Sequence, residues 1–299
     1  SKAGILGRRA AARATDAKIV HTIHGLAFGP TQAWWKNALV IAAERRAARA
    51  TDAFISVADA MTDQAVAAGL GPSAQFTTIY SGVLTGPFYP AAASDAPASP
   101  NSSAAGPQRS GPVPAGAHVV VTQISRLAKR KGHEFLLAAA EAMRDEPIEF
   151  HFVGDGALRH TIEREIARRG LTDVKLVGLV PPEMIPPILR ASDILVHCSL
   201  REGLARAIPQ AMLCGKPVVS FDVDGAREVV TPATGRLVPV RDVPALVTAL
   251  RELAADSPLR RTLGDAGRSL AIRRFDHDHM IDQIAALYQR LMTKDSLTP

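Results

Sequence analysis

Short runs of β-branched and apolar residues alternate with longer amphipathic stretches along most of this chain. Runs bounded by polar or turn residues predict strands, and stretches with helical periodicity predict helices. Their alternation is a β–α–β rhythm, which is typical of parallel sheets. In the first third we predict strands at 18–23, 53–57 and 76–80 and helices at 1–15, 35–50 and 58–68.

The same rhythm is stronger in the remainder of the chain. Near-continuous apolar runs such as HVVVTQI predict strands covered on both faces, as in a parallel sheet flanked by helices. We therefore predict an α/β fold with two doubly wound, Rossmann-like domains, the N-terminal one incomplete. The predicted strands are 118–124, 148–153, 174–177, 193–197 and 217–221, and the predicted helices are 132–143, 158–169, 183–189, 204–214, 243–253, 258–274 and 279–292.

Residues 91–116 interrupt this pattern. The segment is rich in Pro, Ser, Ala and Gly and has almost no large apolar side chains, so burial cannot offset its ordering entropy. It predicts a flexible linker between a partial N-terminal domain (1–90) and a C-terminal domain (117–275). The last segment, 276–299, is expected to be a helix that returns toward the N-terminal domain.

Composition excludes several classes of protein. The 299 residues are 47% apolar and 21% charged, which suits a globular protein with two hydrophobic cores, and no apolar run is long enough to span a bilayer. Cys198 and Cys214 lack CxxC spacing, which favours a reduced, cytoplasmic setting. The chain begins without Met, inside a predicted helix and without the pattern of a signal peptide, which suggests an N-terminally truncated sequence.

The net charge of +6 suggests an anionic partner. Arginines are scattered among alanines, with no basic stripe interleaved with aromatic residues, so a peripheral contact with an anionic membrane is favoured over nucleic acid. A general Arg and Ala bias in composition explains the charge equally well.

Candidate site residues follow several predicted strands, where ligands bind in parallel α/β sheets. Arg126 and Lys131 precede a predicted helix, so they could bind a diphosphate together with the helix N-terminus, although a solvated basic turn is the alternative. Gly154 and Gly156 could let the backbone approach a ligand, or form an ordinary tight turn.

Residues 199–220 (SLREGLARAIPQAMLCGKPVVS) carry the most informative pattern. Glu202 and Gln210 flank a helix that is predicted to begin just after Glu202 and to end at 214–215. Eight helical rises would separate them by roughly 12 Å, about the distance from a ribose to a hexose across a diphosphate. The amides of Gly203 and Leu204 are expected to be free at the start of this helix. A helix-dipole role for Glu202 is the alternative, and Gln210 could be a surface residue.

Two more loops hold secondary candidates. Glu228 follows the predicted strand at 217–221 and could line the same cleft or be an acidic residue in the first turn of a helix. His24 follows the strand KIVHTI, and histidine can donate, accept or carry charge near neutral pH. His21 lies inside that strand and is expected to be structural.

Taken together, these motifs resemble the retaining glycosyltransferases of the GT-B fold, glycosyltransferase family 4 (glycosyl transferases group 1). SRLAKRKGHEFLLAA resembles the family's diphosphate-binding loop, FVGDGALR its glycine-rich turn, and VKLVGLV its nucleobase-side segment, which implies that Leu179 contacts the base. REGLARAIPQAMLCGKPVV resembles its two-glutamate signature, and HTIHG the acceptor-domain motif whose second histidine is His24. Gln210 stands where the family usually has its second glutamate, and Ser81 where it usually has Asn.

The resemblance implies transfer of a hexose, with retention, from a UDP- or GDP-linked sugar to a hydroxyl of a glycan or lipid-linked acceptor. Cell-envelope polysaccharide biosynthesis is the expected setting, in the cytoplasm or peripherally at the inner face of the membrane. Neither a cofactor nor a metal is expected, and Asp222 and Asp224 are read as part of a donor-domain loop.

The resemblance also implies roles for most of the candidates. Arg126 and Lys131 would neutralise the departing diphosphate. Glu202 and the amides of Gly203 and Leu204 would hold the sugar, Gln210 the ribose, and His24 would approach the sugar from the acceptor-side domain. Three alternatives stay open: an inactive donor-binding remnant, a nucleotide-sugar epimerase of the same fold, and, last, a basic nucleic-acid-binding protein.

Overall fold

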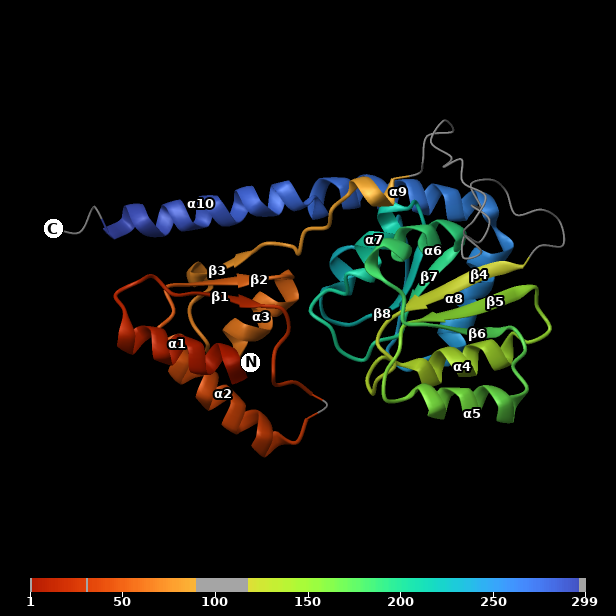
Figure 1. Ribbon diagram of the computed structural model, residues 1–299, viewed down its shortest axis with the longest axis horizontal. Coiled ribbons are helices and arrows are strands. Elements are labelled where there is room, and N and C mark those ends of the chain that lie inside the picture. The colour runs from red at the N-terminus through yellow and green to blue at the C-terminus, as the bar shows by residue number, and fades with distance from the viewer. Residues whose placement is uncertain (1, 31, 90–117, 296–299) are drawn as a thin grey trace. The chain divides into compact units, whose positions relative to one another are not determined.

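The computed structural model describes residues 2–30, 32–89 and 118–295 (Figure 1). These residues fall into two compact units, the first within 1–82, 202–204 and 277–299, and the second within 83–201 and 205–276. The linker predicted at 91–116 lies outside the described residues.

The first unit is built on a three-stranded parallel sheet in the order β1-β2-β3. Successive side chains of a strand point to opposite faces. Phe54 stacks on Phe76 on one face, with ring centroids 4.6 Å apart, whereas Ala53 and Ile55 pack against Leu287 of the last helix on the other. The strands are β1 (Val20–Ile23), β2 (Ala53–Ser56) and β3 (Phe76–Thr78), and the helices are α1 (Lys2–Ala14), α2 (Trp34–Ala48), α3 (Asp59–Ala67) and α10 (His277–Asp295).

The second unit is built on a six-stranded parallel sheet in the order β6-β5-β4-β7-β8-β9. The strand order therefore reverses between β4 and β7, as in doubly wound nucleotide-binding folds. Short apolar strands fill the interior, and Phe150, Phe152 and Phe221 are among its fully buried side chains. The strands are β4 (Val119–Ile124), β5 (Ile148–Val153), β6 (Val174–Gly178), β7 (Ile194–His197), β8 (Val218–Phe221) and β9 (Gly235–Val238).

Helices cover both faces of the larger sheet, with α4 and α5 on one side and α6 and α7 on the other (Figure 1). Asp242 and Asp256 begin α8 and α9 as N-caps, because their carboxylates accept hydrogen bonds from the amides of Ala245 and Leu259 at 2.9 and 2.7 Å. The helices are α4 (His133–Ala142), α5 (Arg159–Arg169), α6 (Ile185–Ala191), α7 (Ala207–Leu213), α8 (Val243–Ala255) and α9 (Ser257–Phe275). Short 3₁₀ turns lie at η1 (Ser73–Gln75), η2 (Gly86–Phe88), η3 (Pro182–Met184) and η4 (Asp224–Glu228).

These elements confirm the predicted α/β fold, but one predicted helix begins in the wrong place. The helix expected just after Glu202 starts at Ala207. Pro209 explains the late start, because proline is tolerated in a first helical turn, whereas in a helix begun near residue 203 its ring would clash with an earlier carbonyl. The 12 Å helical spacing of Glu202 and Gln210 is therefore wrong. The amides of Gly203 and Leu204 do not begin a helix either.

Candidate functional site

Four loops that carry predicted site residues leave the carboxyl ends of neighbouring parallel strands. The loops follow β5, β4, β7 and β8, which are adjacent in that order in the larger sheet. Ligands bind at this edge in such sheets, at the point where the strand order reverses. That point lies between the loop after β4 (125–132) and the loop after β7 (198–206).

The loops after β4 and β5 interlock through their backbones. The amide of Leu127 donates to the Asp155 carbonyl at 2.9 Å, and the amide of Leu158 donates to the Leu127 carbonyl at 2.9 Å. Gly154 and Gly156 have positive φ angles, and a Cβ on either would overlap the carbonyl oxygen of Ser125 or Leu127, respectively. Packing between these two loops therefore requires both glycines, and their donor-binding role stays a prediction.

The loops after β4 and β7 are tied together across the switch point. The amide of Leu200 donates to the Arg130 carbonyl at 2.8 Å. Arg130 has a φ of 73°, a left-handed conformation that is uncommon outside glycine. A Cβ on Gly132, which has a φ of 70°, would overlap the carbonyl oxygen of Cys198. Little room is left for either loop to move alone.

Two buried side chains hold the segment that carries Arg126 and Lys131. Gln123 Nε2 donates to the Lys131 carbonyl at 2.8 Å, and His133 Nε2 lies 3.2 Å from the Arg126 carbonyl. Because a carbonyl can only accept, Nε2 of His133 carries the proton and Nδ1 is left as an acceptor. Gln123 and His133 are 1% and 2% exposed, and burial lowers the pKa of His133. The backbone carbonyl of each predicted phosphate-binding cation is thus held by a buried side chain.

A group of buried polar atoms lies on the same strand ends and on the helix that follows β4. Burial, with a smaller contribution from the charge of Lys131, lowers the pKa of His197 to about 3, so its ring is neutral at pH 7. Buried polar atoms normally bind protein groups or ordered water. Four of them have no hydrogen-bond partner among the described residues: Gln123 Oε1, His133 Nδ1, His197 Nε2 and Ser199 Oγ.

Both basic and acidic side chains lie on the loops at the carboxyl edge of the larger sheet. Arg126 is exposed and Lys131 is half-buried. Burial lowers the pKa of Arg201, and the nearby charge of Asp224 opposes that shift. Asp222 of the predicted donor-domain loop pairs with Arg227 at 3.0 Å.

The remaining predicted residues of the second unit lie on other elements. Gln210 is half-buried on α7, and Glu228 is half-buried at the end of η4, where its carbonyl accepts a hydrogen bond from Arg274 at 3.1 Å. Leu179 follows the edge strand β6 and is 80% exposed, which leaves it available for contact with a flat apolar group.

His24 lies in the first unit, which also includes residues 202–204. It is exposed at the carboxyl end of β1 and lines a pocket of about 130 Å³ with His21, Thr22 and Glu44 among others. Glu44 pairs with the buried Arg8. Burial, and then the charge of Arg8, lower the pKa of His21 to about 4.

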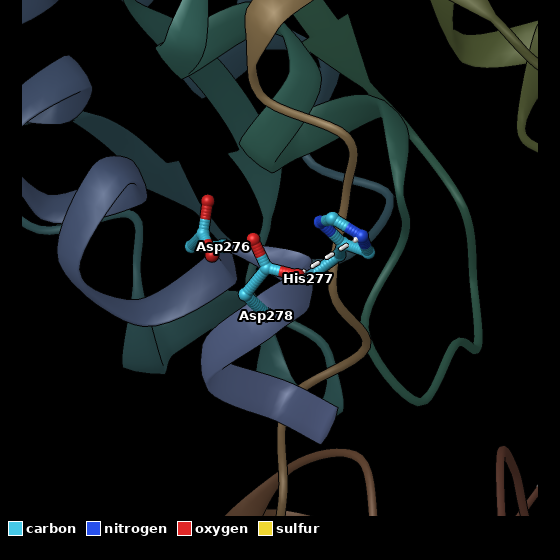
Figure 2. A group of neighbouring side chains, drawn as sticks. All are labelled: Asp276, His277 and Asp278. Atoms are coloured by element: carbon cyan, nitrogen blue, oxygen red, sulfur yellow. Dashed lines mark ion pairs between the residues drawn. The ribbon is translucent and has the colours of Figure 1, made fainter. Parts of the chain in front are cut away.

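Two other features do not belong to the candidate site. A cavity of about 210 Å³ is lined by Ile148 and Val174, the first residues of β5 and β6, so it lies at the opposite end of the sheet. Asp276, His277 and Asp278 have potential metal-ligand atoms within 4.8 Å of one another (Figure 2). Protein contacts account for them, since His277 pairs with Asp278 at 3.3 Å and Asp276 accepts from the Thr85 hydroxyl at 3.2 Å.

Comparisons with known proteins identify the family. Residues 118–256 match the profile described as glycosyl transferases group 1, and residues 1–85 match that of glycosyltransferase family 4. A GDP-mannose-dependent alpha-(1-6)-phosphatidylinositol monomannoside mannosyltransferase of Mycolicibacterium smegmatis is 31% identical over 280 residues, which cover 90% of this chain and 68% of that protein. The chain belongs to glycosyltransferase family 4.

Another relative of this family 4 chain aligns over a shorter stretch. Alpha-D-kanosaminyltransferase of Streptomyces kanamyceticus is 29% identical over 176 residues, covering 58% of this chain and 46% of that protein. The chain thus aligns with about half the length of the first curated relatives.

Solved structures confirm the GT-B fold. Sucrose-phosphate synthase from Thermosynechococcus elongatus superposes with a TM-score of 0.79 at 25% identity, over 97% of this chain and 72% of that one. Anabaena HepE, solved with UDP and glucose, superposes with a TM-score of 0.79 at 24% identity, over 96% and 75%.

Sequence reasoning missed the buried supports of the candidate site in this family 4 chain. Gln123 interrupts the apolar run VVVTQI, and His133 directly follows the KRKG turn. A polar residue at the end of a buried strand is a detectable signal, but which carbonyl it binds depends on how the loop folds back.

Proposed function

We propose that this family 4 chain is a retaining glycosyltransferase that moves a hexose from a UDP- or GDP-linked sugar to a hydroxyl of a glycan or lipid-linked acceptor. Cell-envelope polysaccharide biosynthesis is the proposed setting. The observation that carries the proposal is the loop of Arg126 and Lys131 at the switch point of a doubly wound sheet, with its backbone fixed by Gln123 and His133. Cations carried on a fixed backbone segment at this edge suit a diphosphate.

In this proposal the cations act on the leaving group. Negative charge grows on the diphosphate as the bond to the sugar breaks, and Arg126 and Lys131 stabilise that charge without having to reorganise. The acceptor oxygen attacks from the face that the diphosphate leaves, while its proton passes to the departing phosphate oxygen, and this preserves the anomeric configuration. Neither a metal ion nor a cofactor takes part.

The other predicted residues bind the rest of the donor. Leu179 contacts the base and Gln210 the ribose, while Glu202, Gly203 and Leu204 hold the sugar hydroxyls. Gly154 and Gly156 allow backbone amides to approach the donor, and Glu228 lines the same cleft. His24 approaches the sugar from the first unit.

Relatives support the choice of donor and acceptor. Anabaena HepE was solved with UDP, and the Mycolicibacterium smegmatis relative is named for GDP-mannose and for a phosphatidylinositol mannoside acceptor. A lipid-linked acceptor suits a protein that contacts the cytoplasmic face of an anionic membrane peripherally, and the net charge of +6 favours such a contact. Within the described residues no helix combines the length and the apolarity that a membrane span requires.

Turnover with a panel of UDP- and GDP-hexoses, followed by NMR of the anomeric proton of the product, tests the proposal. Transfer with the α or β configuration of the donor preserved is expected. An inverted product would contradict the mechanism. A changed sugar without transfer would indicate an epimerase, and donor binding without turnover a binding module.

A further inference from the structure

Helix α2 exposes an unusual amount of apolar surface. Trp34, Trp35 and Leu39 are 80%, 49% and 65% exposed, while Ala47 and Ala48 at the other end of the helix are buried. A helix on a protein surface normally shows polar side chains to water. Three large apolar side chains within six positions therefore indicate a surface that binds something.

The apolar residues run directly into basic ones along the same side of the helix. Positions 35, 39, 42, 46 and 49 are separated by four or three residues, so they form one stripe. Trp35 and Leu39 occupy one end of this stripe and Arg46 and Arg49 the other, and all four side chains are exposed. The Lys36 ammonium lies 5.2 Å from the centroid of the Trp35 ring, so charge and aromatic surface are in contact. We call Trp35, Leu39, Arg46 and Arg49 of this stripe, together with Trp34 and Lys36 beside its N-terminal end, the α2 face.

The net charge of the whole chain is concentrated in this part of the sequence. Residues 2–52 hold nine Lys and Arg against three Asp and Glu, whereas residues 53–299 hold 26 of each. Two of those three acidic residues are engaged locally, Glu44 with Arg8 and Asp52 with Lys18. Helix α1, which contacts α2 through Arg8 and Glu44, adds the exposed side chains of Lys2 and Arg13. The positive charge is therefore a local property of α1 and α2.

We propose that the α2 face docks on an anionic lipid bilayer, with the two tryptophans and Leu39 in the interfacial region and the cations against lipid phosphates. Tryptophan prefers the membrane–water interface, and Lys and Arg beside apolar residues are typical of helices that lie in the interface plane. An anionic protein partner would match the charge equally well. Such a partner would be expected to bind a shaped pocket, however, whereas the α2 face consists of exposed tryptophans beside exposed basic side chains. The inference extends the proposed function, since it names the surface that would bring the enzyme to a lipid-linked acceptor.

The protein offers a direct reporter of this surface. The sequence contains two tryptophans, at positions 34 and 35, so intrinsic tryptophan fluorescence comes from the α2 face alone. Adding vesicles of phosphatidylcholine with about 30% of the anionic lipid phosphatidylglycerol should shift the emission to shorter wavelength. Brominated lipids should quench it. Vesicles of phosphatidylcholine alone should do neither at physiological salt.

Variants then separate the apolar and the basic parts in a vesicle flotation assay. R46A/R49A should lower the partition coefficient roughly 30-fold, about fivefold for each arginine. W34S/W35S should lower it more than roughly tenfold. I281S/M292S removes exposed apolar residues from α10, and R164A/R273A removes exposed cations from the second unit. Both control variants should float like the unchanged protein.

Unshifted fluorescence with anionic vesicles would overturn the inference, and so would flotation of W34S/W35S equal to that of the unchanged protein. A blue shift that appears without lipid and depends on protein concentration would also overturn it, because it would indicate a second copy on this face. Nucleoside diphosphate binding in solution separates this inference from the proposed function. W34S/W35S should bind UDP or GDP as the unchanged protein does. A chain that floats but binds no nucleotide would contradict the proposed function and leave the docking surface standing.

Discussion

The hydrogen bond from His133 to the Arg126 carbonyl offers a sharp test of how the candidate site is held. We expect His133→Phe to keep the buried shape, because the histidine ring already packs against Phe152 with centroids 5.8 Å apart. The phenyl ring cannot donate, so the Arg126 carbonyl loses the 3.2 Å contact that fixes it. Leaving such an acceptor unsatisfied costs about 1–3 kcal/mol.

That cost should appear in ligand affinity if the loop loosens. A loss of about 1–3 kcal/mol corresponds to a roughly 5- to 150-fold increase in the Kd for UDP or GDP, measured by isothermal titration calorimetry. Urea unfolding of the same variant measures how much of the cost falls on global stability instead. His151→Phe is a matched control, since His151 lies on β5 and contacts Glu149 rather than the loop.

A double-mutant cycle shows whether His133 acts through Arg126. Arg126→Ala alone removes the guanidinium, so His133→Phe should weaken binding much less in that background. An unchanged Kd in His133→Phe, or effects on affinity that simply add, would show that His133 does not position this cation.

Three further predictions concern the framework around the site. Gly132→Ala should lower the free energy of unfolding by more than about 2 kcal/mol, because the new Cβ meets the Cys198 carbonyl. Gly215→Ala is the control, since Gly215 has a similar φ but open space around it, and it should cost about 1 kcal/mol. Equal losses of the two variants in urea unfolding would show that the Cys198 contact does not matter. The folded pKa of His197 is about 3, below the unfolded value of about 6.5, so its contribution to stability is present above pH 6.5 and is lost as the pH falls. From pH 7 to 5 this histidine alone should remove about 2 kcal/mol, and His197→Gln should show a correspondingly flatter pH profile in chemical denaturation. Burial raises the pKa of both free cysteines, and that of Cys214 to about 11. A disulfide-exchange reagent should therefore label neither thiol in the native protein and both after denaturation. Fast labelling of the native chain would contradict their burial.

The periodicity of apolar residues predicted most of the strands and helices of this chain. Strands β4 and β5 are near-continuous apolar or alternating runs, and the structure has them within one residue of the predicted bounds. Strand β9 was not predicted, because four residues that include Gly235 and Arg236 at a sheet edge give no clear pattern. The start of α7 depended on Pro209, whose tolerance in a first turn is a stronger constraint than the apolar pattern around it.

The candidate site divides in the same way. Loops after strands could be located from sequence, so Arg126, Lys131, Gly154 and Gly156 were placed after two strands, β4 and β5, which prove to be neighbours in the sheet. The side chains that hold the loop after β4, Gln123 and His133, could not be predicted. Their hydrogen bonds join residues seven or eight positions apart through a left-handed turn at Arg130 and Gly132. Helical and strand periodicities do not encode such a turn.

In the proposed function, Arg126 and Lys131 bind the diphosphate of an activated sugar. The most direct measurement is calorimetric titration of UDP, GDP and the two nucleosides into the unchanged protein and into R126A/K131A. The double variant should lose at least roughly 100-fold in affinity for the nucleoside diphosphate, since each charge-assisted contact contributes about 1.5–3 kcal/mol. Any binding of the nucleosides should stay the same. Equal affinity of both proteins for the nucleoside diphosphate would rule out this role of Arg126 and Lys131.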